Sequence, residues 1–580
     1  MADKKFEDVV EASLPEYSSS VKHQHDSEDI SVGETVEVGK LAHHDGEYHR
    51  SFTARQIHVI SLGGQIGAGL FISTGKNLRD GGPASLFLAF FVVCTCVFAV
   101  LQTVSEMTIS FPVSGNFIDY ADRFVDPALA FAAGFSMWLG WTAIIAAEAT
   151  FFSTIVNYWA QDRVNEAVWL TIFLIVMVII FSLPAKVFAW FEYITSILKV
   201  LALLIFMFAG LAIVLGAGPT GRVHHGETWQ DGKAFRNGFK GFGNSVLLAI
   251  LAIGDNTFTG FIAGEAKNPR YSVSHAAFLI PIRVSAFYLI SIILIGLLVS
   301  PTNDRLFGGS GIDASPFVIA LDEAGIPGLP DFLNVVIICG VAAIAAESLY
   351  IASRMLRAMS HQRLIPDWVA KVDAKGRPRA ALLITTIVAF ILTYINLCAG
   401  GITVFNWLAQ IASTGYFMVW VVISITSFRF RAALKAQNDP LFNQVYAWKC
   451  SFWPLPPLWL LTCCSLYTGC SFYLSLYPIV SLSPLPFPFP SSSTIQTSNS
   501  KLQGSTTPTA YYFFQYMFGL ILIFSTGIAY KLIYRTKLRD PKTVDLQTGR
   551  RPLSVEEITE LDEYEAMSGW RRFYTFVQLW

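Results

Sequence analysis

Five ionisable side chains lie inside long apolar stretches of this sequence: Glu106, Glu148, Lys199, Asp255 and Glu347. Placing such a group among apolar residues costs several kcal/mol, so it is a functional candidate by default. Burial favours the neutral form, so a buried carboxyl can hold a proton and a buried lysine can release one. These residues therefore suit proton transfer or the binding of a small charged molecule. For each of them, a structural hydrogen bond or salt bridge between helices is the alternative.

Glycine-rich interruptions occur in two of these apolar stretches. The first is GGQIGAG at 63–69, and the second is GDNT at 254–257, followed by Gly260 and Gly264. Glycine weakens a helix by about 1 kcal/mol relative to alanine. Open backbone within a membrane is tolerated only where protein or a water-filled cavity satisfies its polar groups. Paired interruptions in the two halves of a chain indicate a midplane substrate site, although close helix packing through small residues is the alternative.

The composition shows what kind of element must hold these residues. Of the 580 residues, 53% are hydrophobic and 14% are charged, and the mean hydropathy is +0.49. Such a chain is a polytopic membrane protein, not a soluble enzyme. The net charge of −1 gives no basic excess for nucleic-acid binding. Most cysteines lie in apolar runs without metal-ligand spacing, so no metal or cofactor is expected.

The apolar stretches predict an all-α protein with twelve transmembrane helices. Each stretch can cross the ~30 Å hydrocarbon core at about 1.5 Å per residue. The predicted spans are 57–78, 84–107, 128–156, 167–183, 192–215, 240–263, 277–299, 332–357, 380–398, 402–428, 453–477 and 510–534.

Charge placement predicts the orientation. Lys and Arg are concentrated in the even-numbered connections, with seven between Arg354 and Arg379. Because cytosolic loops retain positive charge, both termini are predicted to be cytosolic. Residues 1–50, with twelve acidic and five basic residues, predict a disordered tail, and 536–580 predict a second cytosolic tail. The Pro/Ser-rich connection at 481–510 cannot be a helix and is either a loop or a gene-model artefact.

Several long strings resemble the fungal amino acid permeases, the yeast amino acid transporter family of the amino acid–polyamine–organocation superfamily. They are SLGGQIGAGLFISTGKNLRDGGPASL at 61–86, SEMTISFPVSGNFIDYADRFVDPALAFAAG at 105–134, GFIAGEAKNPR at 260–270 and VFNWLAQIASTGYFMVWVVISITSFRFRAALKAQ at 404–437. The resemblance implies a ten-helix core over 51–430, built as two inverted five-helix repeats with helices 1 and 6 broken. Peripheral helices 11 and 12 would occupy 431–535.

The two breaks predict how an amino acid would bind. N–H groups at the start of the second half of helix 1 suit a carboxylate, and carbonyls at the broken end of helix 6 suit an ammonium group. The resemblance implies the same roles, and Phe258 is the candidate lid. The predicted binding residues are Ile66, Gly67, Ala68, Gly69, Ile253, Gly254, Asp255, Asn256, Thr257 and Phe258.

Proton coupling is predicted at Lys199, Glu148 and Glu347. Lys199 resembles the lysine that takes the place of a sodium ion in related proton-driven transporters, and Glu148 lies where the family carries a glutamate. Many members have Gly-Thr-Glu in the helix-6 break, whereas this chain has Thr257 in place of that glutamate. Our hypothesis is that Asp255 or Glu347 supplies the missing carboxylate.

Three charged residues fit gating or structural roles. Glu106 is predicted to pair with Arg123 or with another basic loop residue, and Glu265 to form a cytosolic gate or a solvated cap.

The leading function is import of amino acids at the plasma membrane by proton symport with alternating access, driven by the proton gradient without a cofactor. The vacuolar membrane is the alternative location. Lysines and serines in the N-terminal tail suit ubiquitin ligase and arrestin-type adaptors, as in the family. The alternative functions are proton-coupled carriage of a related cationic solute, such as a polyamine or carnitine, and amino acid sensing without transport.

Overall fold

The computed structural model consists of helices joined by turns and loops in the residues that it describes. These are 63–113, 115–161, 163–182, 185–254, 269–306, 315–373, 377–399, 401–444, 446–479, 510–550 and 555–578. Within them strand-like pairing is limited to isolated bridge residues, between Leu215 and Val223 and at Leu306, so the prediction of an all-α protein is confirmed. The N-terminal tail, residues 481–509 of the Pro/Ser-rich connection, the stretch from Asp255 to Phe258, and Glu265 lie outside the described residues.

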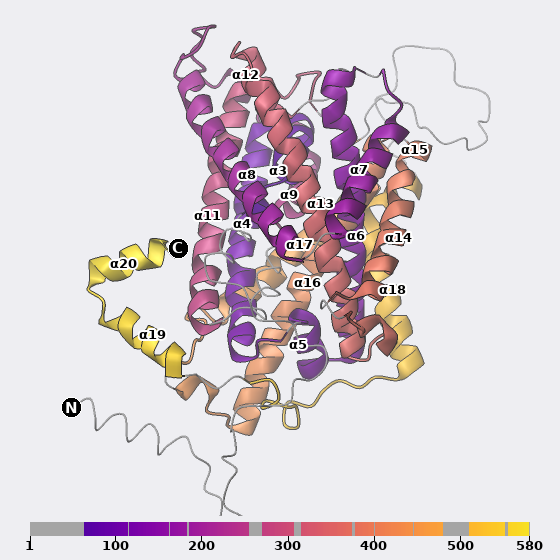
Figure 1. The fold of residues 1–580 in the computed structure, drawn as a ribbon, viewed down its shortest axis with the longest axis vertical. Helices are drawn as coiled ribbons and strands as arrows, with labels where there is room; N and C mark the ends of the chain where they lie inside the picture. The colour runs from indigo at the N-terminus through magenta and orange to yellow at the C-terminus, as the bar shows by residue number, and fades with distance from the viewer. Residues whose placement is uncertain are drawn as a thin grey trace, which may run out of the picture. The chain divides into compact units, whose positions relative to one another are not determined.

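The helices of the first half of the chain include a break at 66–67 and a sharp bend at Gly82. Its helices are α3 (Ala68–Phe71), α4 (Ser73–Ser110), α5 (Phe117–Phe124), α6 (Pro127–Ala160), α7 (Glu166–Ser182), α8 (Ala185–Val214), η1 (Glu227–Trp229) and α9 (Gly238–Ile253) (Figure 1). Helix α4 joins the end of the first predicted span to the second. Gly82 bends it with φ of 80°, a value that glycine adopts without steric cost, and Pro83 follows.

The second half contains the remaining predicted spans. Its helices are α11 (Pro269–Leu298), α12 (Pro316–Glu323), α13 (Leu329–His361), η3 (Asp367–Ala370), α14 (Arg379–Tyr394), α15 (Asn396–Ala399), α16 (Gly401–Gln437), η4 (Leu441–Asn443), α17 (Leu455–Leu476), α18 (Ala510–Tyr534), α19 (Val555–Ala566) and α20 (Gly569–Gln578).

Eight helices among the described residues are long and apolar enough to cross a membrane, and α7, α9 and α14 are shorter apolar helices. Each predicted span contains one helix or consecutive helical pieces where its residues are described; the first span before Gly63 and the sixth span after Gly254 lie outside the described part. The chain is therefore an integral membrane protein, as predicted.

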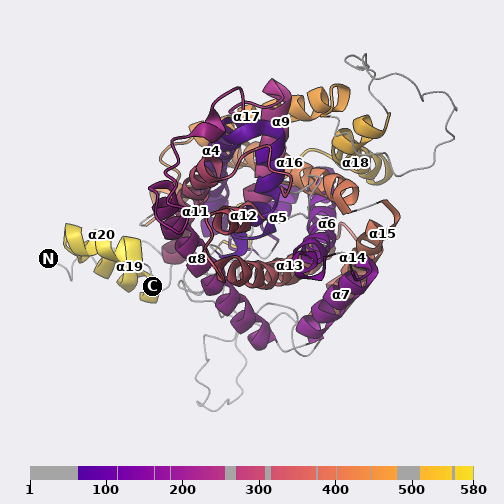
Figure 2. The same cartoon turned by 90° about the horizontal axis from the view of Figure 1, so that it is seen from above.

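Burial separates inner helices from outer ones. The most apolar windows of α6 and α16 are 78% buried, whereas those of α8 and α18 are 33% and 28% buried. Helix α6 packs against α13 and α16, and α4 packs against α9 and α11 (Figure 2). The outer helices expose large apolar side chains, including Phe208, Leu383 and Phe524. Such continuous apolar faces suit contact with lipid.

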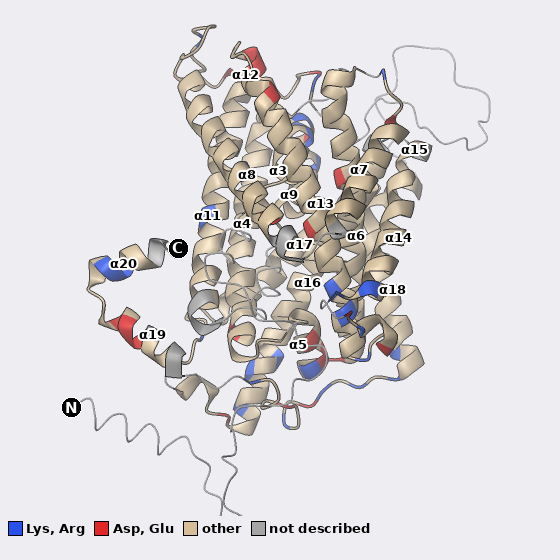
Figure 3. Ribbon diagram, viewed as in Figure 1, with Lys and Arg blue, Asp and Glu red and all other residues tan. Residues whose placement is uncertain are grey.

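The segment after α18, residues 535–550, is the C-terminal strap. It lies against the ends of α5, α6 and α16, where many Lys and Arg residues are found (Figure 3). Arg539 Nη2 is 3.0 Å from Asp122 Oδ1, and Arg550 Nη1 is 3.0 Å from both carboxyl oxygens of Asp439. The strap thus ties three helix ends together.

Candidate substrate and ion site

The first helix break lies at Ile66–Gly67. Residues 63–65 are helical, the two break residues are not, and α3 begins at Ala68. A Cβ atom on Gly67 would lie 1.6 Å from Ile344 Cδ1, and one on Gly69 would lie 2.6 Å from Ala252 Cα. The glycines therefore permit both the open backbone and the close packing that were weighed as alternatives.

Helix α9 ends at Ile253, where the second break is predicted. Gly254 follows, and a Cβ atom there would lie 3.0–3.1 Å from the Tyr416 ring on α16. The Tyr416 ring meets Trp141 of α6 edge to face, with centroids 5.8 Å apart. Because Gly69, two residues after the first break, packs on Ala252, the first break lies close to the end of α9. The predicted residues 66–69 and 253–254 are thus brought together.

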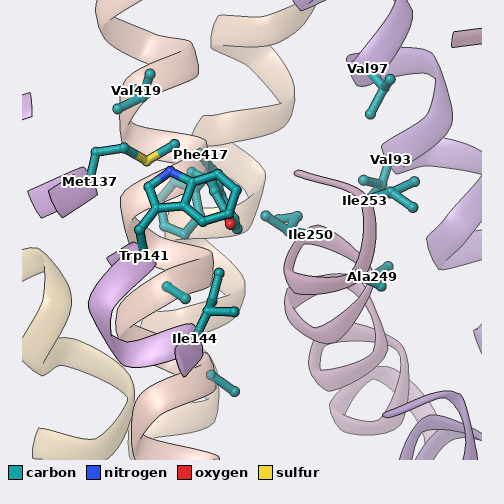
Figure 4. Close-up of a cluster of buried hydrophobic side chains, with 14 of the residues drawn as sticks. Val93, Val97, Met137, Trp141, Ile144, Ala249, Ile250, Ile253, Phe417 and Val419 are labelled. Carbon is teal, nitrogen blue, oxygen red and sulfur yellow. The ribbon is translucent and has the colours of Figure 1, made fainter. Parts of the chain in front are cut away.

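An apolar layer surrounds this meeting point. Figure 4 shows Trp141 and Ile144 of α6 near Phe417 of α16, with Ile250 of α9 facing them. These side chains are at least 90% buried. Polar groups that enter the layer therefore lack bulk water to solvate them.

A cluster of charged side chains is buried beside the first break. Lys199 Nζ lies 3.9 Å from Glu192 Oε1, and their side chains are 0% and 3% exposed. A Cβ atom on Gly64 would lie 2.7 and 2.8 Å from the carboxyl oxygens of Glu347, so this carboxyl packs directly on the helix just before the break. Glu347 interacts electrostatically with Glu192 and Lys199, and Glu148 interacts with Lys199.

The charge balance of this cluster is incomplete. Three carboxylates and one ammonium group would give a net charge of −2 in a buried volume, where uncompensated charge is costly. Several of their polar atoms have no hydrogen-bond partner in the described part of the chain: Glu148 Oε2, both carboxyl oxygens of Glu192, Lys199 Nζ and Glu347 Oε1. Bound protons or a bound cation would correct this imbalance.

The structure gives Glu106 a partner other than Arg123. Arg431 near the end of α16 forms two bonds to the Glu106 carboxyl, at 2.7 and 2.5 Å, and the Cys450 N–H donates a third at 2.9 Å. The prediction of a basic partner other than Arg123 thus fits Arg431, although this residue lies in the last turns of α16 and not in a loop. Arg123 instead donates to the Thr548 carbonyl of the C-terminal strap at 2.7 Å.

Two tryptophans of the apolar spans lie in helix contacts away from the breaks. Trp138 donates its indole N–H to Thr385 Oγ1 on α14 at 3.1 Å. Trp407 packs against Tyr511 and Phe518 of α18. Both tryptophans therefore join α6 or α16 to outer helices.

The sequence matches one family of known proteins over most of its length. The family model for amino acid permeases matches residues 56–542. The chain belongs to the amino acid permease family. Among relatives, Amino-acid permease GAP3 of Candida albicans is 30% identical over 558 residues, which covers 95% of this permease and 88% of the relative. General amino-acid permease GAP1 of Saccharomyces cerevisiae is 31% identical over 538 residues and covers 91% and 85%.

Two further matches carry names other than amino acid permease. Cationic amino acid transporter 1 of Schizosaccharomyces pombe is 30% identical over 536 residues, or 90% of this permease and 85% of the relative. A solved structure of Mhp1, a nucleobase-cation-symport-1 family transporter, has 17% identity and a TM-score of 0.39, covering 76% of this permease and 98% of that chain. The latter likeness is too weak to assign a property. Family membership assigns amino acid transport to this membrane protein.

Two residues at the site of this permease were not predicted from the sequence. Glu192 begins the predicted fifth span, where a charge suggests a membrane boundary. Its spacing of seven residues from Lys199, two helix turns, is the signal that places both on one face of α8. Tyr416 has no such signal, because its contact with Gly254 joins helices that are distant in sequence.

Proposed function

We propose that this permease imports amino acids across the plasma membrane by proton symport with alternating access. The observation that carries the proposal is the buried Lys199 cluster beside the first helix break. Lys199 and Glu192 lie on α8, while Glu347 lies on α13 and its carboxyl touches Gly64, two residues before Ile66. A change in protonation here acts directly on the backbone next to the proposed substrate site.

The substrate's charged ends would bind at the two breaks. The carboxylate would accept from backbone N–H groups of Gly67, Ala68 and Gly69, since the Ile66 N–H already donates to the Gly63 carbonyl at 3.1 Å. The ammonium group would donate to carbonyls at Ile253 and Gly254. Contact between Gly69 and Ala252 supports a shared site, because it brings the two ends into the same place. Asp255 to Phe258, which the sequence also predicts for this site, lie outside the described residues.

Binding of a proton would change the electrostatic attraction between α8 and α13. A proton on Glu347 or Glu192 removes one negative charge from the neighbourhood of Lys199, and electrostatic attraction between buried groups is strong. Since α8 carries Lys199 and α13 carries Glu347, the change alters how α8 and α13 hold the segment at 63–65. Glu148 is the third carboxyl able to exchange a proton with Lys199. This coupling links the proton gradient to the conformational cycle.

Orientation and regulation follow the charge pattern. The end of the bundle with α5, Arg123 and the C-terminal strap is proposed to face the cytosol, in keeping with the positive-inside rule. The N-terminal tail would then reach cytosolic ubiquitin ligases and arrestin-type adaptors. Cysteine labelling at exposed positions on both ends of the bundle, in intact cells, tests this orientation.

Uptake by permease-deficient yeast cells tests the function. Cells expressing the permease receive labelled amino acids, a polyamine or carnitine, at two external pH values and with an uncoupler. We expect amino acid accumulation that is greater at the lower pH and is lost with uncoupler. Accumulation of polyamine or carnitine alone would favour the cationic-solute carrier, and amino acid binding without uptake would favour a sensor.

The variant Glu347→Gln tests whether the Lys199 cluster is responsible for the pH dependence of uptake. We expect it to reduce the pH dependence of uptake, because the amide cannot ionise. Glu323→Gln on α12 is the matched control, since Glu323 lies outside the cluster and contacts Asn303. Unchanged pH dependence and substrate profile in Glu347→Gln would contradict the role given to this carboxyl.

A further inference from the structure

One buried phenol connects the two helix breaks. The Tyr288 hydroxyl on α11 donates to the carbonyl of Gln65, the last helical residue before the first break, and to the carbonyl of Ala252 at 2.8 Å. Ala252 is the penultimate residue of α9, next to the predicted second break. Broken helices leave carbonyls that need a partner inside a membrane. Tyr288 offers its one hydroxyl proton to a carbonyl beside each of these two positions.

The position of the phenol is fixed by its surroundings. Tyr288 is fully buried, and its ring stacks on Phe90 of α4 with centroids 5.7 Å apart and planes inclined by 25°. Stacked aromatic rings restrain each other's position. The hydroxyl is therefore held at the junction by α4 and α11, neither of which contains the bonded carbonyls.

A phenol has one proton, so it cannot donate two full hydrogen bonds at the same time. The Tyr288 proton is shared between two carbonyls that belong to different broken helices. The shared bond requires both carbonyls to stay within reach of one oxygen atom. Separately, Gly69 packs so closely on Ala252 that no Cβ atom fits between them. Two independent contacts thus set the spacing of the breaks.

We propose that Tyr288 is a positioning residue for amino acid binding. Resting on the proposed function, this inference holds that Tyr288 fixes the distance between the carboxylate-binding and ammonium-binding ends. That distance must match the one backbone that all amino acids share. Loss of the hydroxyl would therefore weaken the binding of every amino acid substrate by a similar factor. A change in a side-chain pocket would weaken the binding of some substrates more than that of others.

The test compares Tyr288→Phe with Tyr120→Phe. Tyr120 is also a buried tyrosine that donates to a backbone carbonyl, that of Phe111 at 2.6 Å, but it lies on α5 away from the breaks. We expect Tyr288→Phe to raise KM about 5- to 10-fold, the effect of losing one buried hydrogen bond, by the same factor for a small and a large amino acid. Tyr120→Phe should leave KM within about twofold, and both variants should reach the membrane at wild-type abundance.

Three results would overturn the inference: an unchanged KM in Tyr288→Phe, an equal rise in Tyr120→Phe, or a rise confined to one substrate. Should Tyr288→Phe fail to reach the membrane, Phe90→Leu decides, because it keeps the hydroxyl and removes the ring that holds it. A raised KM in Phe90→Leu supports the inference, and an unchanged KM overturns it. Absence of amino acid uptake by the wild-type permease would instead refute the proposed function.

Discussion

Replacing Arg431 by methionine isolates the ion pair at one end of the bundle. The Glu106 side chain is 2% exposed and Arg431 is 20% exposed. Without Arg431, the buried carboxylate retains the Cys450 N–H as its remaining partner among those described above. Removing one member of a buried pair costs about 3–5 kcal/mol, because the other charge stays buried without compensation.

Replacing the other member of the pair, Glu106, should lower the unfolding free energy by less. In Glu106→Gln, Arg431 is partly exposed and still lies over the rings of Phe442 and Trp453, at 4.3 and 4.9 Å from the centroids. The loss is then about 1.5–3 kcal/mol, the range for hydrogen bonds to charged groups. The lysine variant Arg431→Lys should fall between these changes, since it keeps the charge but loses the two-pronged geometry.

Thermal melting of the purified permease, followed by tryptophan fluorescence, measures these differences. Lys537→Met in the C-terminal strap is the matched control, because it removes an exposed positive charge without breaking a buried pair. We expect the melting temperature to fall most in Arg431→Met and least in Lys537→Met. Equal falls in these two variants, or a greater fall in Glu106→Gln, would refute the reasoning.

Two further predictions concern the same end of the permease. Burial raises the pKa of Asp119 to about 6, against the opposing effect of the Gly115 N–H. The folded state therefore binds the proton more firmly, so wild-type stability is lost as the pH rises through 6. Asp119→Asn should be more stable at pH 7.5 by up to about 3 kcal/mol, with no advantage near pH 4; melting curves at both pH values check this, and equal gains would contradict it. Asp126 caps α6 by accepting from the Ala128 N–H at 2.8 Å, so Asp126→Ala should lower the unfolding free energy by about 1–2 kcal/mol. Lys531 is the exposed partner of Asp126, so Lys531→Ala should lower it by less than about 1 kcal/mol. An equal loss in both variants would show that the cap is unimportant.

Local sequence signals predicted the elements and the breaks. Apolar runs long enough for a membrane became helices, and clustered glycines between 63 and 69 marked the break at Ile66–Gly67. The reason is that helix length and glycine weakness act within a few neighbouring residues. The bend at Gly82 falls in the predicted connection between the spans 57–78 and 84–107, where the GGP sequence is a turn signal.

Long-range partners were beyond the sequence. Glu106 and Arg431 are 325 residues apart, and the carbonyls that share Tyr288 lie 223 and 36 residues from it. One sequence contains no pairing signal at such distances. The acidic or basic type of a residue indicates that it needs a partner, but only the packing of the helices selects which one.

The central claim is that the Lys199 cluster couples protons to amino acid movement. Its most direct test is accumulation of labelled amino acid in proteoliposomes that contain the purified permease and an imposed pH gradient. We expect the wild-type permease to accumulate substrate above equilibrium, and Lys199→Met to exchange amino acids across the membrane without accumulating them. Gradient-driven accumulation by Lys199→Met at the wild-type level would contradict the account.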